Sequence, residues 1–556
     1  MYSFDIDGTI VSFENRKMAR FYFILLISVL LLVPSQIQCE EEEENEGYPV
    51  LQQQKHSHYY RRPPSSVEVS SMYQEENLKL FVDDKIDYHM KENNSVLAWS
   101  HLAIKMYSES NQPLWEAIRY HAILHDSIDK ALSSTGCRNK NKKHVENISS
   151  CSKQILDMVI GHSAHMVLTA LFPGSNEDVK AMMKDTYSKA LTKSGGSGNN
   201  NNNQQENLDM KHARYLGETA ASQVLYDRYL KDGSLGFIDY NSVMGMEGRW
   251  SDISIYCKSD DTEEDCSKQQ QSTPPLNRFV NSRTYSYDNG VNITKSILET
   301  MVGGGPPSIT DNSYSYYHTE VMKLGGSTVN RTEDEMLIIR FHDSFMRRGT
   351  ALSMWVEIAS RKILERHKDT ATATAYQYMT MIFDTSSLMN LITRSLYDTL
   401  VMTSKMKTMY DTWRPVTAIN KGVTGNPTVP PKNENWRPTQ NMLFDYSYDQ
   451  EYPSLYSACT SSFTNVMKVY FGSSTGGGGG EDEDEITIQR EDDVYRTYSN
   501  LNELKNECSK LGILTGAHFG FSTKSGERLG ESVSNNVYKL FCRGNYCTSS
   551  ALNKGG

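Results

Sequence analysis

The sequence has no extended basic patch, no apolar run long enough to span a membrane comfortably, and little strand-like alternation of apolar and polar residues. Its formal net charge is −11, from 57 Lys and Arg against 68 Asp and Glu. Affinity for a phosphate backbone comes from clustered Lys and Arg, so this balance argues against a general nucleic-acid binder. With 556 residues, 38% of them hydrophobic, the chain can bury a large core in one large domain or two to three ordinary ones.

Several catalytic arrangements are also missing. The sequence offers no credible order of Ser, His and Asp, no zinc-binding cysteine cluster and no phosphate-cradling P-loop. A segment from Phe4 to Ile10 matches the aspartate-nucleophile motif of haloacid-dehalogenase-type phosphatases, but no α/β domain surrounds it. His121, His125 and Asp129 lie at i, i+4 and i+8 and could present three metal ligands along one helix face. A place in the helical core is the favoured interpretation of these three residues.

The N-terminus has the pattern of a targeting segment. Basic residues at positions 16, 17 and 20 precede an apolar run over residues 21–33. That run is short for a transmembrane helix, so residues 1–39 are predicted to be an N-terminal extension and a cleaved secretory signal. A start at Met18 would give a more ordinary signal peptide than a start at Met1. We therefore expect a secreted protein, or one of the endomembrane lumen, with no stable membrane span.

Cysteine and asparagine patterns agree with export. Apart from Cys39 near the cleavage point, eight cysteines remain, an even number as expected in an oxidising compartment. The close pairs Cys137/Cys151, Cys257/Cys266 and Cys542/Cys547 would close short loops, which leaves Cys459 and Cys508 for each other. Potential glycan acceptors are Asn93, Asn147, Asn292 and Asn330.

Low-complexity segments separate the rest of the chain into blocks. Residues 40–75 form an acidic linker, and residues 195–205, 257–275 and 476–485 are polar, Gly-rich or acidic. We expect these segments to be solvated insertions. The acidic runs could bind calcium loosely, but a solvated surface is favoured.

Helical periodicity fills the blocks between the insertions. Leu388, Ile392, Leu396 and Leu400 recur at i+4, within an interval from Gly349 to Pro415 that has no internal Gly or Pro. This pattern predicts a buried helix that delivers Lys407 near its C-terminal end. Further helices are predicted over residues 96–132, 151–172, 209–231 and 333–367. The expected fold class is all-α, a large helical bundle.

Lys407 and Arg414 lie where this helix ends. Pro415 cannot continue the helix and disfavours the α region for Arg414. Two cations fixed in this way could point at one tetrahedral oxyanion. The alternative for an isolated Lys and Arg-Pro at this spacing is a basic helix terminus that proline stops.

The surrounding residues carry a family resemblance. The segment DTLVMTSKMKTMYDTWRPVTAI, residues 398–419, resembles the first motif of the vanadium-dependent haloperoxidases, which share a superfamily with the type 2 phosphatidic acid phosphatases. Further similarities follow in the family's order, over residues 97–129, 217–234, 324–341 and 355–360. The resemblance covers most of residues 90–540. It implies a bundle of the acid phosphatase and haloperoxidase type, with an N-terminal helical region over residues 76–330 and a C-terminal one over residues 331–548 that carries the oxyanion site.

The resemblance also implies which residues would hold vanadate, or phosphate in a phosphatase. They are Lys407, Arg414, Ser454, Leu455 and Gly512, with His518 as the apical ligand of vanadium or as a phosphatase nucleophile. The second motif of the family is Pro-Ser-Gly-His and the third is Ser-Arg-x5-His. In this chain Leu455 replaces the glycine, Tyr456 replaces the acid-base histidine, and Gly512 replaces the arginine.

These replacements predict an impaired site. An oxyanion that gains charge needs preorganised cations, and each lost charge-assisted hydrogen bond removes about 1.5–3 kcal/mol. Tyr456, with an unperturbed pKa of about 10, is a poor proton shuttle, and losing a positioned acid-base costs about 10²–10⁴-fold in rate. Lys510 could substitute for the missing arginine after a slip in register, but a surface position is favoured.

The resemblance therefore implies a secreted haloperoxidase-like protein, from a family that uses vanadate and hydrogen peroxide to oxidise halide, with catalysis impaired. Two alternatives stay open. One is a non-catalytic exported helical protein that retains a weak phosphate or vanadate pocket, and the other is a phosphatase on the same scaffold. The expected partners are small anions, peroxide and halide, and an oligomer is plausible for the family.

Overall fold

A computed structural model of the protein describes part of the chain, and the residues it describes are 2–4, 10–12, 94–110, 112–138, 151–174, 176–192, 200–232, 247–249, 275–287, 293–346, 351–368, 374–439, 449–472, 485–489 and 494–542. The predicted signal, the acidic linker and the two aspartates of the dehalogenase-like motif lie outside these residues. Strands β1 (Tyr2–Phe4) and β2 (Ile10–Ser12) pair antiparallel at the N-terminus.

Helices dominate the described part of the chain, which confirms the all-α fold class. The first group is α3 (Ser95–Glu109), α4 (Leu114–Ser134), α6 (Lys153–Leu171), α7 (Asn176–Thr192) and α8 (Asn200–Asp232). The second is the turn η3 (Pro275–Phe279), α10 (Lys295–Val302), α11 (Asn312–Leu324), α12 (Glu333–Met346), α13 (Ala351–Arg366), α14 (Ala375–Tyr410), α15 (Pro415–Lys421), α16 (Leu455–Phe471), α17 (Leu501–Leu514) and α18 (Gly520–Phe541). A two-stranded hairpin, β3 (Ile486–Gln489) and β4 (Tyr495–Tyr498), lies between α16 and α17.

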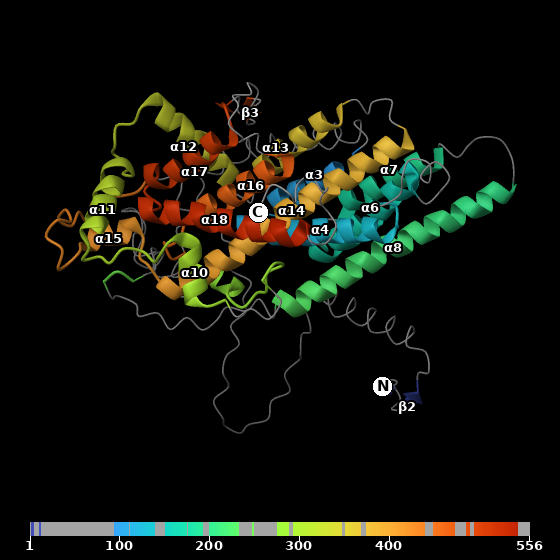
Figure 1. The fold of residues 1–556 in the computed structure, drawn as a ribbon, viewed down its shortest axis with the longest axis horizontal. Helices are drawn as coiled ribbons and strands as arrows, with labels where there is room; N and C mark the ends of the chain where they lie inside the picture. Colours follow the sequence, from blue (N-terminus) through green and yellow to red (C-terminus); the bar gives the residue numbers. More distant parts are fainter. Residues whose placement is uncertain are drawn as a thin grey trace, which may run out of the picture.

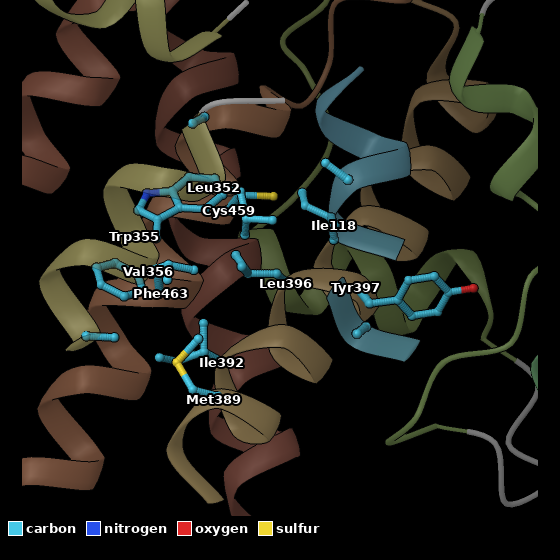
Figure 2. Close-up of a cluster of buried hydrophobic side chains, with 14 of the residues drawn as sticks. Ile118, Leu352, Trp355, Val356, Met389, Ile392, Leu396, Tyr397, Cys459 and Phe463 are labelled. Atoms are coloured by element: carbon cyan, nitrogen blue, oxygen red, sulfur yellow. The ribbon is translucent and has the colours of Figure 1, made fainter. Parts of the chain in front are cut away.

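Helix α14 connects the two groups (Figure 1). It packs against α4 from the first group and against α16 and α18 from the second. Its N-terminus has a capping box in which Thr374 and Gln377 exchange hydrogen bonds. The predicted apolar stripe is fully buried, from Leu388 to Leu400, and forms part of the core in Figure 2. The prediction of a buried helix that carries Lys407 near its C-terminal end is confirmed.

Three predicted helix boundaries need correction. The helix predicted over residues 96–132 is two helices, because Pro113 caps α4 and its missing N–H cannot serve a helix interior. The helix predicted over residues 333–367 is also two, α12 and α13, with residues 347–350 outside the described part. Residues 200–205, predicted to be part of an insertion, are the first turns of α8, since extending an existing helix costs far less than nucleating one.

The cysteines divide into bonded and free ones. The predicted bond Cys137–Cys151 is present, whereas Cys459 and Cys508 are free and buried, so the bond predicted between them is wrong. Cys459 lies in the apolar core near Leu352 and Trp355 (Figure 2). Cys508 lies in α17 and is 1% exposed. Cys542 is disulfide-bonded, but Cys257, Cys266 and Cys547 lie outside the described residues.

We expect these two free thiols to be protected in the folded protein. Burial raises the pKa of both, that of Cys508 to about 12, so neither offers an accessible thiolate. Iodoacetamide should therefore alkylate Cys459 and Cys508 only after denaturation, and without any reductant. Peptide mapping by mass spectrometry checks this, and recovery of a peptide pair linked through the two residues would contradict it.

None of the helices in the described ranges is both long enough and apolar enough to cross a membrane.

Candidate functional site

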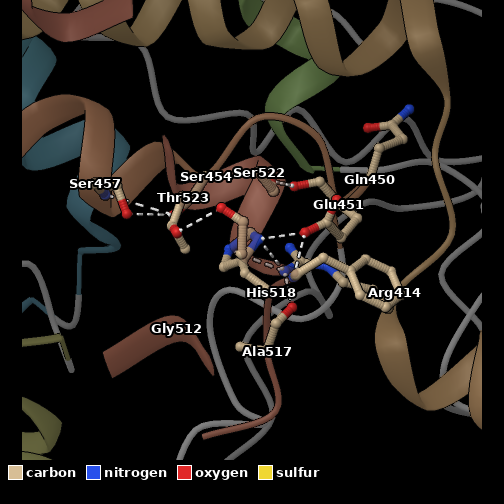
Figure 3. Close-up of polar contacts among 12 residues, drawn as sticks. Arg414, Gln450, Glu451, Ser454, Ser457, Gly512, Ala517, His518, Ser522 and Thr523 are labelled. Atoms are coloured by element: carbon tan, nitrogen blue, oxygen red, sulfur yellow. Dashed lines mark hydrogen bonds and ion pairs between the residues drawn. The ribbon is translucent and has the colours of Figure 1, made fainter. Parts of the chain in front are cut away.

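Three chain segments meet around the predicted oxyanion residues (Figure 3). The first is the end of α14 with the loop to Arg414, which is extended and begins α15 at Pro415. The second is the segment 449–454, which leads into α16. The third is the turn at residues 517–519, which leads into α18. Hydrogen bonds between these segments bring Lys407, Arg414 and His518 around the main chain of residues 449–451.

The two cations are buried and bound to carbonyl groups. Lys407 is 1% exposed, and its Nζ donates to the carbonyl oxygens of Gln450 and Glu451. Arg414 is 2% exposed and donates from Nε to Asp449 O at 2.8 Å and from Nη1 to Ala517 O at 2.9 Å. Burial, and for Lys407 also the nearby charge of Arg414, lowers the pKa of each side chain. Both cations thus hold the segment 449–451 in place.

His518 has a partner on each ring nitrogen. Its Nδ1 lies 3.1 Å from Glu451 Oε1, and its Nε2 lies 3.1 Å from Arg414 Nη1. Burial, followed by the charges of Arg414 and Lys407, lowers the pKa of His518 well below its usual value, so the ring is neutral. Arg414 Nη1 is also 3.4 Å from Nδ1, so it lies over the ring face and not in line with the Nε2 lone pair. Because the Glu451 carboxylate is an acceptor, the proton of the neutral ring is assigned to Nδ1, which donates to Glu451.

Glu451 is a site residue that the sequence analysis missed. Its side chain is fully buried, and Oε1 also accepts the main-chain N–H of Phe519 at 2.9 Å. Burial raises the pKa of Glu451, while Arg414 and Lys407 oppose that rise. The carboxylate therefore lies among the cations that were expected to face an oxyanion.

Ser454 and Leu455 begin helix α16. Ser454 is the N-cap, and its Oγ accepts from the main-chain N–H of Ser457 at 3.5 Å and lies 3.1 Å from Ser457 Oγ. The main-chain N–H of Ser454 donates to Ser522 O, which ties this turn to α18. Leu455, 2% exposed, belongs to the core. Ser454 thus has a structural role as a helix cap.

Tyr456 belongs to a buried hydrogen-bonded relay. Its hydroxyl lies 3.1 Å from His342 Nδ1, and His342 Nε2 lies 3.0 Å from Glu507 Oε1. The ring stacks on Trp355 with centroids 6.1 Å apart. Because α12 and α17 supply the relay, no spacing in the sequence indicated that His342 or Glu507 would meet Tyr456.

Gly512 packs directly against His518. A Cβ atom built on Gly512 would lie 3.1 Å from Thr523 Cγ2 and 3.3 Å from His518 Cβ. The Cβ atom of an arginine at this position would therefore be closer to its neighbours than most Cβ atoms in proteins are. Lys510, the possible substitute cation, is half exposed and pairs with Glu335 at 3.4 Å, in agreement with the surface position favoured from the sequence.

The histidines of α4 lie in the core, as favoured. His121 and His125 both hydrogen-bond to Ser100 Oγ, at 2.9 and 3.1 Å, and Asp129 accepts from Asn390. Over the described ranges, no group of three or more His, Cys, Asp or Glu side chains is placed to hold a metal ion.

The helical arrangement is that of the vanadium-dependent haloperoxidases. The chain is similar to a solved structure described as the first bacterial vanadium-dependent iodoperoxidase, with 13% identity and a TM-score of 0.53, over 80% of this chain and 96% of that one. It is also similar to an apo-type bacterial vanadium-dependent chloroperoxidase, with 12% identity and a TM-score of 0.52, over 77% and 93% of the two chains. At these identities the similarity demonstrates the fold.

A sequence comparison agrees with the structural one. Residues 387–544 match the family model of the VCPO second helical-bundle domain. The resemblance inferred from the sequence is thereby confirmed, by the family model over residues 387–544 and by the fold over most of the chain. No curated protein sequence matches the chain.

The residues present do not fit bound vanadate. Arg414 and Lys407 are bound to main-chain carbonyls, and Arg414 Nη1 lies against the face of the His518 ring. A buried carboxylate lies beside them, where it would repel a second anion. The third cation of the family is replaced by Gly512, beside which a side chain has little room.

Proposed function

We propose that this protein is an exported haloperoxidase-fold protein without vanadate-dependent catalysis. The observation that carries the proposal is that Lys407 and Arg414, the two cations expected to hold vanadate, donate to main-chain carbonyls. Donors held in this way are not aimed at the oxygens of a bound oxyanion. Arg414 Nη1 also lies over the face of the His518 ring, 3.1 Å from Nε2 and 3.4 Å from Nδ1. The same contacts argue against a phosphatase with His518 as nucleophile.

The acid-base position supports the same proposal. Tyr456 stands where the family has its second histidine, and its hydroxyl is hydrogen-bonded to His342, which Glu507 holds from the other side. A tyrosine hydroxyl, with a reference pKa of about 10, is a poor proton shuttle near neutral pH.

Export is supported by two features besides the predicted signal. The disulfide Cys137–Cys151 is of the kind that persists in oxidising compartments. Asn330, one of the four potential glycan acceptors, is exposed. We propose secretion, or residence in the endomembrane lumen, on this basis.

The purified protein should not halogenate a dye when it is incubated with orthovanadate, peroxide and bromide. The physical reason is that the two cations are bound to main-chain carbonyls and no positioned acid-base replaces the missing histidine. The rate should equal that of a protein-free blank, and removal of vanadate should change nothing. Vanadate-dependent turnover that disappears in His518→Ala would overturn the proposal.

A further inference from the structure

The proposed loss of catalysis leaves one question about the same site, which is what neutralises its two buried cations. We propose that Glu451 is a built-in anionic ligand, which occupies the place that a tetrahedral oxyanion such as phosphate or vanadate would otherwise take. This inference rests on the proposed function and extends it to the chemistry of the site.

The charges around Glu451 balance without any added ion. Lys407 and Arg414 contribute two positive charges, and the carboxylates that act on both of them are Asp449 and Glu451. His518 is neutral. Buried cations need hydrogen bonds and nearby negative charge, and these two bind main-chain carbonyls and lie in the field of both carboxylates. Adding a phosphate dianion would leave the site with excess negative charge in a dry environment.

The donors around the Glu451 carboxylate are those that oxyanion sites use. Oε1 accepts from His518 Nδ1 and from the main-chain N–H of Phe519, the N-cap residue of α18. That helix runs for 22 residues, and its N-terminus favours negative charge. Oε2 is buried and has no hydrogen-bond partner among the described residues. An imidazole and a helix N-terminus therefore meet at one carboxylate, and the charges of Arg414 and Lys407 act on it as well.

The backbone of Glu451 is fixed, so the carboxylate is a permanent occupant. Its carbonyl oxygen accepts from Ser522 Oγ at 3.1 Å and from Lys407, and its N–H donates to Thr412 O at 2.9 Å. These contacts come from α18, from α14 and from the loop that follows α14. With the backbone anchored on three segments and Oε1 bound to His518 Nδ1 and the N–H of Phe519, the side chain is held in the site.

Removing the carboxylate should therefore create a binding site for oxyanions. In Glu451→Ala, the cations and the α18 N-terminus lose their anion, and the missing carboxymethyl group leaves space. Inorganic phosphate should then bind the folded state and stabilise it in proportion to ln(1 + [L]/Kd). Halogenation should stay absent, since Tyr456 and Gly512 are unchanged.

The test compares thermal unfolding in phosphate and in chloride at equal ionic strength, with calorimetry for Kd. For Glu451→Ala, Tm should rise by roughly 3 °C or more when phosphate reaches 100 times Kd, and wild type should not respond. Glu451→Ala combined with Arg414→Ala should lose the response. Glu357→Ala is the matched control, because it removes a buried carboxylate of α13 that pairs with Arg361 at 2.7 Å.

Two results would overturn the inference. One is a wild-type protein whose Tm rises with phosphate as much as that of the variant, and the other is a folded Glu451→Ala protein that does not respond. If Glu451→Ala does not fold, Glu451→Gln keeps the volume and removes the charge. The Tm of Glu451→Gln should rise with phosphate, by less than expected for Glu451→Ala but by more than in wild type. A Glu451→Gln protein whose Tm does not change with phosphate would contradict the proposal. Phosphate binding is measured without turnover, so a failure here leaves the proposed lack of catalysis untouched.

Discussion

Replacing Gly530 with alanine is expected to destabilise the protein by about 3 kcal/mol or more, the upper range for overpacking a rigid contact. A Cβ atom on Gly530 would lie 2.0 Å from Ala458 O and 2.8 Å from Ser462 N. Both atoms belong to the backbone of α16, so no side chain can rotate away to relieve the clash. The helices α16 and α18 would have to separate.

This contact also supports the candidate site. Gly526 lies one turn before Gly530, and a Cβ atom built on it would be 2.5 Å from Ser454 O. Glycines therefore allow α18 to pack closely against the start of α16. The same two helices carry the hydrogen bonds from Ser454 N to Ser522 O and from Ser522 Oγ to Glu451 O. Separating them would weaken the fold and the polar cluster together.

Urea denaturation followed by far-UV circular dichroism would measure the effect. Gly174→Ala is the matched control, because Gly174 is exposed and a Cβ built there meets no atom within 4 Å. The control should unfold within about 0.5 kcal/mol of wild type. Equal midpoints for Gly530→Ala and Gly174→Ala would contradict the tight packing of α16 on α18.

Much of the fold could be predicted from local sequence patterns. The i+4 stripe from Leu388 to Leu400 predicted α14, because burial of an apolar face is a local property of the helix. Positions 347–350 carry no proline, and Gly349 alone did not indicate that two helices meet there. The bond predicted between Cys459 and Cys508 failed since cysteine counting ignores the direction in which each side chain points.

The candidate site could be predicted only in part. Lys407, Arg414 and His518 were identified by motif spacing, and the structure brings them together. Glu451 was overlooked because a glutamate beside a Pro-Ser turn has no sequence signal that distinguishes a buried acid from a surface one. Tyr456 was expected at the reaction centre, but its hydroxyl is bound by His342, more than one hundred residues earlier in the chain. Such long-range partners follow from tertiary packing alone.

Replacing Asp232 with alanine is expected to cost about 3–5 kcal/mol, the usual effect of removing one partner of a buried ion pair. Asp232 is 1% exposed and ends helix α8. Its carboxylate accepts from Arg119 Nε at 2.9 Å and from the hydroxyl of Tyr397 at 2.6 Å, and it lies 3.6 Å from Arg228 Nη1. It thus joins α8 to α4 and to α14.

The size of the effect follows from the charges that would remain. Burial alone would lower the pKa of Arg119, but the charges of Asp232 and Glu116 raise it overall. Without Asp232, Arg119 would keep Glu116 at 3.9 Å and Arg228 would keep its carbonyl partner, Arg283 O. Two buried guanidinium groups would then have less negative charge near them. The free-energy cost of a buried charge without enough counter-charge is larger than the cost of the lost hydrogen bonds.

Two comparisons isolate this cause in urea denaturation. Asp232→Asn keeps an acceptor for Tyr397 but not the charge, so it should remain strongly destabilised if the charge is decisive. Glu177→Ala removes an acid that is 90% exposed and pairs with Lys180, and it should change stability by less than about 0.5 kcal/mol. A loss in Asp232→Ala no larger than that of Glu177→Ala would mean that α4, α8 and α14 are held by apolar packing alone. The ion pairs around Asp232 would then make no net contribution to the free energy of unfolding.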